Sequence, residues 1–186
     1  MTVFAEVLDF WFGAPGSPER GRPRKMWCRK SEAFDAEVRH RFLSLWERAA
    51  GGGLESWGAT PLASLALLVV LDQFPRNMFR GAARAFSTDS LALARATSVV
   101  ERAFDRLLSP VERTFVYLPF EHAEDLAAQR RSLELFGARD PGNLEWARRH
   151  HEIVARFGRF PHRNAILGRE STAEEIEFLK QPGSSF

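Results

Sequence analysis

The sequence has a single cysteine, Cys28, in 186 residues, and this scarcity limits what the chain can build. One cysteine forms neither an intramolecular disulfide nor a cysteine-rich metal site, which fits a reducing compartment. The longest apolar stretch, Leu62–Leu71, is about ten residues, half of what a membrane-spanning helix needs. The first residues carry Glu6 and Asp9 and no basic leader, so we expect no signal peptide, no membrane partner and a cytoplasmic location.

The signature motifs of several common enzyme classes are also missing. The chain contains no Gly-x-Gly-x-x-Gly, no Gly-x-x-x-x-Gly-Lys-Ser/Thr, no Gly-x-Ser-x-Gly and no His-Glu-x-x-His. Common nucleotide-binding folds, α/β hydrolases and zinc proteases therefore lose their usual signals. No strand pairs or hairpin turns can be identified either.

The net charge is close to zero and indicates little about possible partners. The formal net charge is +2, hydrophobic residues make up 45% of the chain, and acidic residues alternate with the many arginines. Nucleic-acid binders usually gather their basic residues on one stripe, so we expect no nucleic-acid partner. Length and composition predict one compact domain over residues 1–186.

Apolar periodicity and capping residues predict an all-α fold of about eight helices in antiparallel pairs, as in an α-solenoid. A nearly all-apolar segment at 62–71 should be the central, fully surrounded helix. Pro119 should kink or break the helix that begins at residue 109, between Tyr117 and Phe120. The expected helices cover residues 3–12, 31–50, 61–71, 89–104, a segment from 109, and 121–136, 143–157 and 172–180.

One short sequence motif, here called the phrase, occurs twice in the chain. It reads Phe74-Pro75-Arg76-Asn77 in the first copy and Phe160-Pro161-His162-Arg163-Asn164 in the second. Proline fixes its own φ and disfavours helical geometry in the preceding residue, so we expect a turn and a short new helix at each proline. Free N–H groups beside an arginine would make both turns receptive to anions.

Three polar clusters are candidates for chemistry. The first surrounds Pro75, the second follows Pro119, and the third surrounds Pro161 with one histidine upstream. Their members are Asp72, Arg76, Asn77 and Arg80; Glu121, His122, Glu124, Asp125 and Gln129; and His150, Arg156, Arg159, His162, Arg163, Asn164 and Arg169.

Each cluster also has a purely structural interpretation. If a helix begins at Glu121, its acidic first turn is explained by the helix macrodipole. His150 shares a face with Trp146 and Ile153, which suits a core histidine. The arginines can be ties to carboxylates such as Asp72 or Glu124.

Four longer motifs resemble those of the bacterial DUF924 family, a domain of unknown function. They are Val7-Leu8-Asp9-Phe10-Trp11-Phe12-Gly13, Leu71-Asp72-Gln73-Phe74-Pro75-Arg76-Asn77, Leu118-Pro119-Phe120-Glu121-His122-Ala123-Glu124-Asp125 and Arg156-Phe157-Gly158-Arg159-Phe160-Pro161-His162-Arg163-Asn164. The resemblance implies an all-helical fold similar to tetratricopeptide-repeat proteins, and no established activity or cofactor. The family's characteristic polar positions fall on most residues of the three clusters, with departures at Ala123, where serine is usual, and His151, where arginine is usual.

The leading hypothesis is a domain that binds an anionic small molecule or a peptide terminus. Arg76 and Arg163, with Arg80 or Arg159, would clamp a carboxylate or phosphate, because guanidinium forks match these groups. Whether the domain is an enzyme stays open. If it is one, the acid–base residues would be His122, Glu124 and His162. The ligand-binding set would be Asp72, Arg76, Asn77, Arg80, Asp125, Gln129, His150, Arg156, Arg159, Arg163 and Asn164.

Two alternatives compete with this hypothesis. The first is a non-catalytic protein-interaction scaffold in which the clusters are internal ties. The second is a metal-dependent enzyme that uses His122, Glu124, Asp125 and His150, although we assign no metal or cofactor from the sequence. Full pairing of the polar groups with each other would favour the scaffold.

Overall fold

The chain folds into α-helices joined by short turns and 3₁₀ segments in the computed structural model, which describes residues 2–27 and 29–185. Cys28 lies outside the described residues. Across those residues no strand is found, which confirms the all-α prediction. The helices are α1 (Val3–Phe12), α2 (Glu32–Ala50), α3 (Pro61–Leu68), α4 (Phe74–Met78), α5 (Asp89–Glu101), α6 (Pro110–Glu121), α7 (Leu126–Arg139), α8 (Leu144–Phe157) and α9 (Ala173–Leu179).

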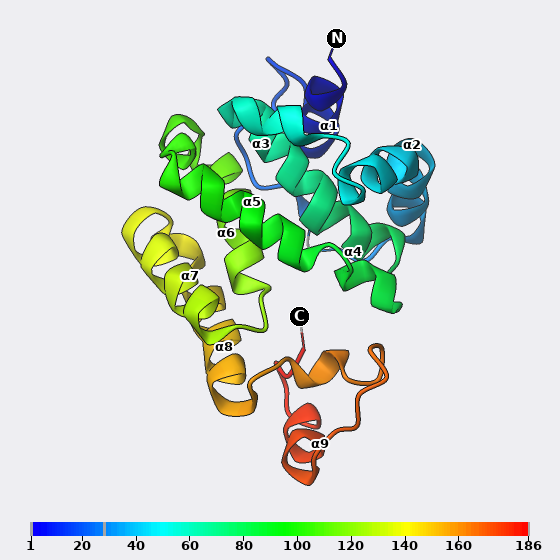
Figure 1. Ribbon diagram of the computed structural model, residues 1–186, viewed down its shortest axis with the longest axis vertical. Helices are drawn as coiled ribbons and strands as arrows, with labels where there is room; N and C mark the ends of the chain where they lie inside the picture. Colours follow the sequence, from blue (N-terminus) through cyan, green and yellow to red (C-terminus); the bar gives the residue numbers. More distant parts are fainter. Residues whose placement is uncertain (1, 28, 186) are drawn as a thin grey trace.

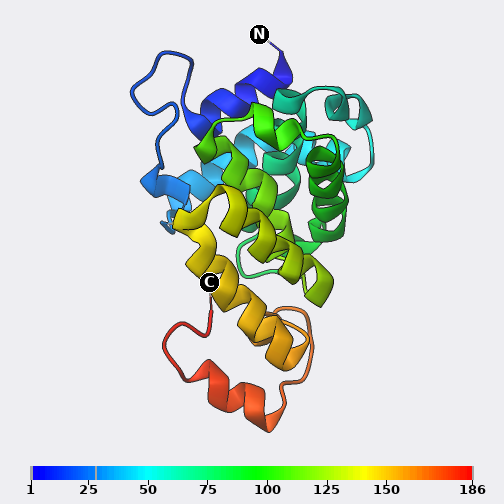
Figure 2. The ribbon, with the colours of Figure 1, turned by 90° about the vertical axis from the view of Figure 1, so that its left-hand side faces the viewer.

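Helices α1 to α7 form a helical body, and the chain from the second half of α8 to residue 185, here called the C-terminal segment, extends from one end of it (Figures 1 and 2). α3 and α4 run through the middle of the body, and α5, α6, α7 and α8 pack in succession beside them. α8 carries the chain away from the body to α9 (Figure 2). No helix in the described part of the chain is long and apolar enough to cross a membrane.

The central helix is continuous from Pro61 to Met78, but its middle is wound as a π-helix over Val69–Gln73, here called η3. Every residue from Ala63 to Asp72 is buried, which confirms the prediction for 62–71 except at Leu62, which is 44% exposed. A π-turn widens the helix by one residue per turn and is frequent at functional sites. It places Asp72, an ionisable residue, inside an otherwise apolar core.

Pro75 does not end this helix, so the predicted break at the first copy of the phrase is wrong. Phe74 keeps helical geometry with φ −59° and ψ −43°, and its N–H reaches the carbonyl of Val69 in the π pattern. Pro75 has no N–H for the carbonyl of Leu71, four residues earlier. That carbonyl instead accepts a hydrogen bond from the Thr88 hydroxyl at 2.6 Å.

The second copy behaves as predicted. Phe160 is extended with φ −93° and ψ 106°, and a short 3₁₀ turn, η7 (Pro161–Arg163), follows it. The same phrase therefore adopts two backbone conformations. Long-range packing around Thr88 decides the first, whereas the local effect of proline decides the second.

The corner between α6 and α7 also differs from the prediction. Pro119 lies inside α6, which continues to Glu121, so the expected break is wrong, whereas a kink at Pro119 stays a prediction. α7 begins after Asp125, whose side chain caps it by accepting from Ala128 N–H at 2.7 Å. Glu121 is therefore the last residue of α6 and not the first of α7, where the macrodipole would have favoured a carboxylate.

Other helix ends show where capping residues guide the chain. Ser31 caps α2, and Ser109 and Thr172 each form a capping box. α5 ends at Glu101, three residues before the predicted end, and Ala103 follows in left-handed geometry at φ 57°. Thr88 precedes α5 without capping it, because its hydroxyl is used on the central helix.

The C-terminal segment has its own small core. Ile153, Val154 and Phe160 form a hydrophobic cluster separate from the main one, and Phe157 and Phe178 pack against it. Ion pairs join this segment to the body.

Thr88→Val tests the account of the central helix. The Thr88 hydroxyl donates to Leu71 and accepts from the Trp46 indole N–H at 3.3 Å. Valine keeps the shape but leaves both buried groups without this partner, so we expect a loss of about 1–3 kcal/mol in unfolding free energy. Urea denaturation measures it. Ser87→Ala, at an exposed neighbour, should cost less than about 0.5 kcal/mol, and equal losses in the two variants would contradict the account.

Candidate functional site

The centre of the candidate site is a carboxylate–imidazole pair. Asp72 is 1% exposed, and its two carboxylate oxygens lie 2.8 and 3.0 Å from Nδ1 of His122, the C-cap residue that follows α6. A carboxylate only accepts, so Nδ1 of His122 carries the proton and donates it to Asp72. Nε2 of His122 is then the basic nitrogen, and the His122 side chain is 15% exposed.

The surrounding charges fix the ionisation of this pair. Burial alone would raise the pKa of Asp72, but Arg76, His122 and the Gln73 amide outweigh it and hold that pKa well below its usual range. Burial and the charge of Arg76 lower the pKa of His122, and Asp72 offsets this only in part. At neutral pH Asp72 is therefore ionised, and His122 is neutral and able to accept a proton.

Asp89, the first residue of α5, brings the two copies of the phrase together. Arg76, from the first copy, donates to both of its oxygens at 2.8 and 3.0 Å. Arg163, from the second copy, lies 3.4 Å from the same carboxylate. Arg76 also donates to the Asp72 carbonyl at 2.8 Å, so Asp89 is linked through one guanidinium to the Asp72–His122 pair.

Arg163 is the cation with the least complete pairing in this group. It is 6% exposed, its Nε makes no hydrogen bond to a described residue, and its contact with Asp89 is long. Its guanidinium packs 4.5 Å from the ring centres of both Phe86 and Phe160. Burial, with the charge of Arg76, lowers the pKa of Arg163 to about 10, so it remains a cation at neutral pH.

A second buried pair lies beside the first. The Glu121 carboxyl is 3.2 Å from Nδ1 of His150, which is also 2.9 Å from the Trp146 carbonyl. The imidazole rings of His150 and His122 are 6.3 Å apart. Burial, with the negative charge of Asp72, raises the pKa of Glu121 to about 8, and burial lowers the pKa of His150 to about 3.

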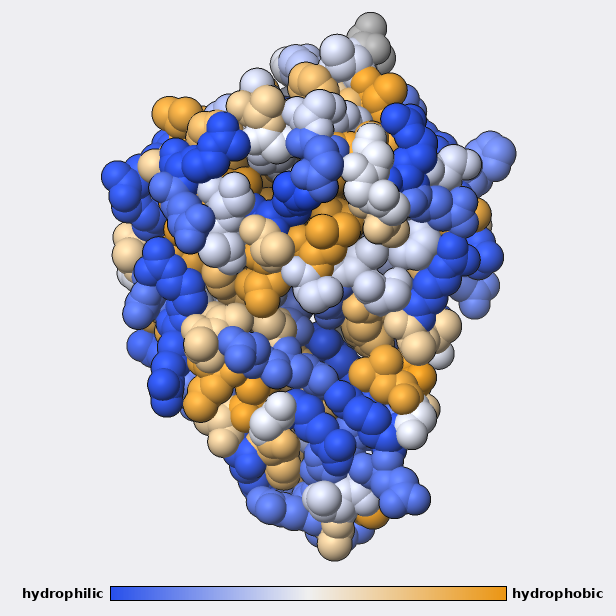
Figure 3. All heavy atoms as spheres, viewed as in Figure 1, coloured by the Kyte–Doolittle hydropathy of each residue, from blue (hydrophilic) through white to orange (hydrophobic). Residues whose placement is uncertain are grey.

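The second copy of the phrase forms the opposite side of the site. His162 is half-buried against Phe160, with ring centres 5.6 Å apart. Burial, with the charge of Arg163, lowers its pKa to about 4, so it is neutral at physiological pH. Between the body and the C-terminal segment the surface is hollowed, with hydrophilic residues in the hollow and hydrophobic residues on its borders (Figure 3). Arg163 and Asp89 bridge these two parts of the protein.

Glu124, a predicted acid–base residue, instead joins the helical body to the C-terminal segment. It accepts from both terminal nitrogens of Arg169, at 2.6 and 2.9 Å, and from the Phe160 N–H at 2.7 Å. Burial opposes ionisation of Glu124, but these bonds lower its pKa below the usual range. Both oxygens are engaged, which favours a tethering role for Glu124 over proton transfer.

Several other predicted site residues lie outside this group and hold helices together. Asn77 and Arg80 bind Asp35 in the first turn of α2, at 2.8 Å each. Asp125 caps α7, and the buried Gln129 amide donates to two backbone carbonyls at the α6–α7 corner.

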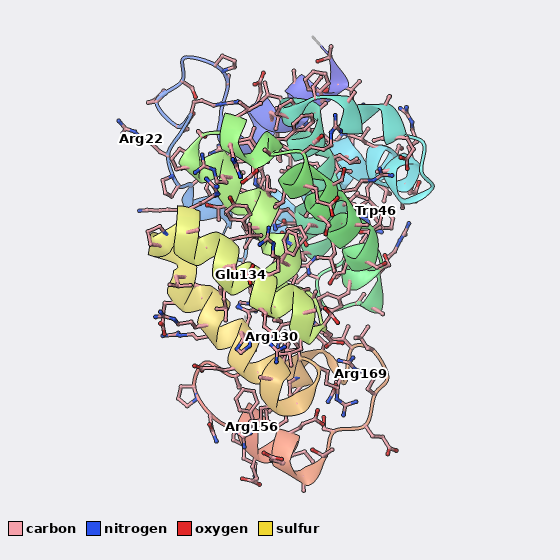
Figure 4. All side chains as sticks on the ribbon, turned by 60° about the vertical axis from the view of Figure 1, so that its left-hand side comes forward. Arg22, Trp46, Arg130, Glu134, Arg156 and Arg169 are labelled. Atoms are coloured by element: carbon pink, nitrogen blue, oxygen red, sulfur yellow. The ribbon has the colours of Figure 1, made fainter. Side chains whose placement is uncertain are left out.

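The remaining predicted residues tie α9 to the turn that precedes it. Arg159 and Asn164 donate to Glu175, at 2.7 and 3.2 Å. Arg156 pairs with Glu174 on the exposed surface. Figure 4 shows Arg156 and Arg169 on opposite sides of the C-terminal segment.

The sequence prediction missed Asp89 and the role of Glu121. Asp89 reads as an ordinary first-turn acid of a helix, and only the fold brings Arg76 and Arg163 to it. The role of Glu121 was missed because the prediction placed the start of α7 at this residue. Asp125, followed by Leu126 and two alanines, is the capping signal that could have located that start.

The metal hypothesis requires its four residues to point toward one common position. His122 and His150 approach each other, but Glu124 and Asp125 point to Arg169 and to the α7 cap. Among the described residues, no group of three or more potential ligands is placed to hold a metal ion.

Glu121→Gln should stabilise the protein increasingly as the pH rises. The pKa of Glu121 is raised from 4.5 to about 8 in the fold, so between these values the folded protein keeps a proton that the unfolded chain releases. This group therefore lowers the unfolding free energy of the wild type by up to about 1.4 kcal/mol per pH unit in that window. Glutamine mimics the neutral acid and does not titrate. Denaturant unfolding should give similar stabilities at pH 5 and a more stable variant at pH 8.

The comparison has a matched control. Glu152→Gln, at an exposed position of α8, should change stability by the same small amount at every pH. His150 and His162, whose pKa values are lowered by burial, make the protein less stable only below about pH 6.5, so the change in the difference between pH 7 and pH 8 belongs to Glu121. A Glu121→Gln difference that does not vary with pH, or a less stable variant at pH 8, would refute the assignment.

Comparisons with known proteins find one matching family and one similar solved structure. The family described as bacterial protein of unknown function (DUF924) matches residues 7–183. A solved structure of a protein of unknown function, ATU0120 from Agrobacterium tumefaciens, is similar with 43% sequence identity and a TM-score of 0.86, over 96% of this chain and 97% of that one. No curated protein matches the chain. The chain belongs to the DUF924 family.

Proposed function

We propose that the protein binds a small molecule or peptide terminus that carries a carboxylate or phosphate, and that His122 exchanges a proton with it. The ligand would occupy the hollow between the helical body and the C-terminal segment. The observation that carries the proposal is the incompletely paired Arg163 guanidinium, coupled through Asp89 and Arg76 to the Asp72–His122 pair.

Arg163 is suited to bind the anionic group. Arg76 occupies both oxygens of Asp89, which leaves Arg163 with one long contact to that carboxylate. A ligand carboxylate or phosphate would give this guanidinium a second and closer charged partner, and such bonds are among the strongest in proteins. The low exposure of Arg163 would strengthen the interaction, because little water screens it.

His122 is suited to exchange the proton. Its Nε2 is the basic nitrogen, since Nδ1 donates to Asp72. A hydroxyl group of the ligand, or a water molecule bound beside it, could transfer a proton to Nε2. Ionised Asp72 would stabilise the resulting imidazolium. The same carboxylate holds the ring in one orientation, so the base is positioned before the ligand binds.

A protein-interaction scaffold is the second candidate function, and a specific observation favours it. Asn77, Arg80, Arg159 and Asn164 all bind carboxylates on neighbouring helices, as a tie between helices would. The similarity to tetratricopeptide-repeat proteins and partner binding on the outer helical surface stay predictions of this alternative.

Calorimetric titration with chosen anions tests the proposal. The probes are acetate, citrate, inorganic phosphate and glycylglycine, with glycylglycine amide to show whether a free peptide carboxylate is needed. Arg163→Lys keeps the charge but loses the planar fork, and His122→Gln removes the base. We expect the wild type to bind at least one anion and each variant to bind it about tenfold more weakly, the effect of losing one charge-assisted hydrogen bond.

Arg80→Gln is the matched control, because Arg80 binds Asp35 outside the site. Its affinity should equal that of the wild type. Thermal unfolding of each variant shows whether the fold is intact, which matters because Arg163 packs between two aromatic rings. Failure of every probe to bind, or equal affinity in all variants, would favour the scaffold.

A further inference from the structure

A second cavity lies in the helical body. Its volume is about 310 Å³, and it opens between α3, α5 and the 3₁₀ segment η2 (Glu55–Ala59). α3 and α5 lie side by side in the body (Figure 1). Asp89 and Ser98, both on α5, are nine positions apart, or about 13 Å along the helix axis. The cavity is therefore separate from the group around Asp89.

One face of α5 supplies a wall of this cavity. Arg95, Ser98, Val99 and Arg102 all line it, and their spacing of three, four and seven residues places them on the same side of the helix. Val99 is buried, whereas Ser98 is half-buried between the two arginines. The wall thus combines an apolar base with a hydroxyl group and two guanidinium groups.

α3 supplies the floor. Ser64 and Leu67 line the cavity and are only 4% and 3% exposed. The Ser64 hydroxyl donates to the Trp57 carbonyl at 3.3 Å, so its oxygen can still accept a hydrogen bond. A ligand that reaches this floor would bury an apolar part against Leu67 and Val99.

The charges at the rim do not balance. Arg95 pairs with Glu55, whose side chain is 61% exposed. Arg102 donates to the Gly58 carbonyl and stacks 4.0 Å from the Phe104 ring centre, and no carboxylate of a described residue lies within ion-pair distance of it. Two guanidinium groups face one carboxylate, so the rim carries one excess positive charge.

We propose that this cavity binds a small organic anion, with its apolar part on Leu67 and Val99 and its carboxylate or phosphate between Arg95 and Arg102. The volume is at the lower end of the range for small-molecule sites, which limits the ligand to a compact body such as one ring. The site is independent of the function proposed for the group around His122.

Amide NMR titration of the full chain tests this site with three probes. Benzoate and phenyl phosphate carry a ring with a carboxylate or a phosphate, and inorganic phosphate carries the charge alone. We expect saturable shifts of the amides of Ser64, Leu67 and residues 95–102, with a ring-bearing probe binding more tightly than inorganic phosphate. Arg102→Gln should weaken that probe about tenfold, the effect of losing one charge-assisted hydrogen bond.

Three further variants keep the result decisive. Ser98→Phe should fill the cavity and block the probes, and Arg95→Gln gives a second loss of charge if Arg102→Gln does not fold. Arg148→Gln, on the exposed side of α8, should bind as the wild type does. No saturable shift at these amides with any probe would overturn the proposal. Unchanged binding in both Arg102→Gln and Ser98→Phe would overturn it as well.

Discussion

An ionised carboxylate buried in the central helix determines much of how this protein is built. Moving a charge out of water costs several kcal/mol unless partners replace the lost hydration. Asp72 therefore takes hydrogen bonds from Gln73 and His122 and an ion pair with Arg76. The π-helical turn brings this residue into the core, and proline at position 75 is tolerated because Thr88 serves the carbonyl of Leu71.

Each partner of Asp72 then needs a partner of its own. Arg76 is balanced by Asp89 at the start of α5, and Asp89 in turn draws in Arg163 from the C-terminal segment. Arg169 and Glu124 add a second bridge between the same two parts. A polar chain thus runs from the middle of the body to the C-terminal segment, and its last cation, Arg163, is the least satisfied. Structural ties and the candidate site are parts of one network.

The sequence predicted most helices because their signals are local. Ser31, Ser109 and Thr172 cap helices whose apolar spacing is regular, so the all-α class followed directly. The predictions failed where distant residues decide the outcome. Nothing near Pro75 shows that Thr88 will serve the carbonyl of Leu71, and nothing near Pro119 shows that α6 will continue to Glu121.

The candidate site was predictable in its residue types but not in its membership. Asp72, Arg76, His122 and Arg163 were identified from the sequence, and the fold brings them into one network. Arg80, Arg156, Arg159 and Asn164 looked equivalent, yet each has a carboxylate partner elsewhere. Separating these two sets requires knowing which carboxylate lies beside each arginine or asparagine. Only tertiary packing brings Asp89 and Glu175 to their partners.

The most direct test of this account is the protonation state of His122, because the site depends on a neutral imidazole held by an ionised carboxylate. Nitrogen-15 NMR of the histidine side chains, with His122→Gln to assign the signals, reports the tautomer and the pKa together. We predict a proton on Nδ1, an unprotonated Nε2 at pH 7, and a pKa below the ordinary value of 6.5. A proton on Nε2 at pH 7, or a pKa at or above 6.5, would contradict the account.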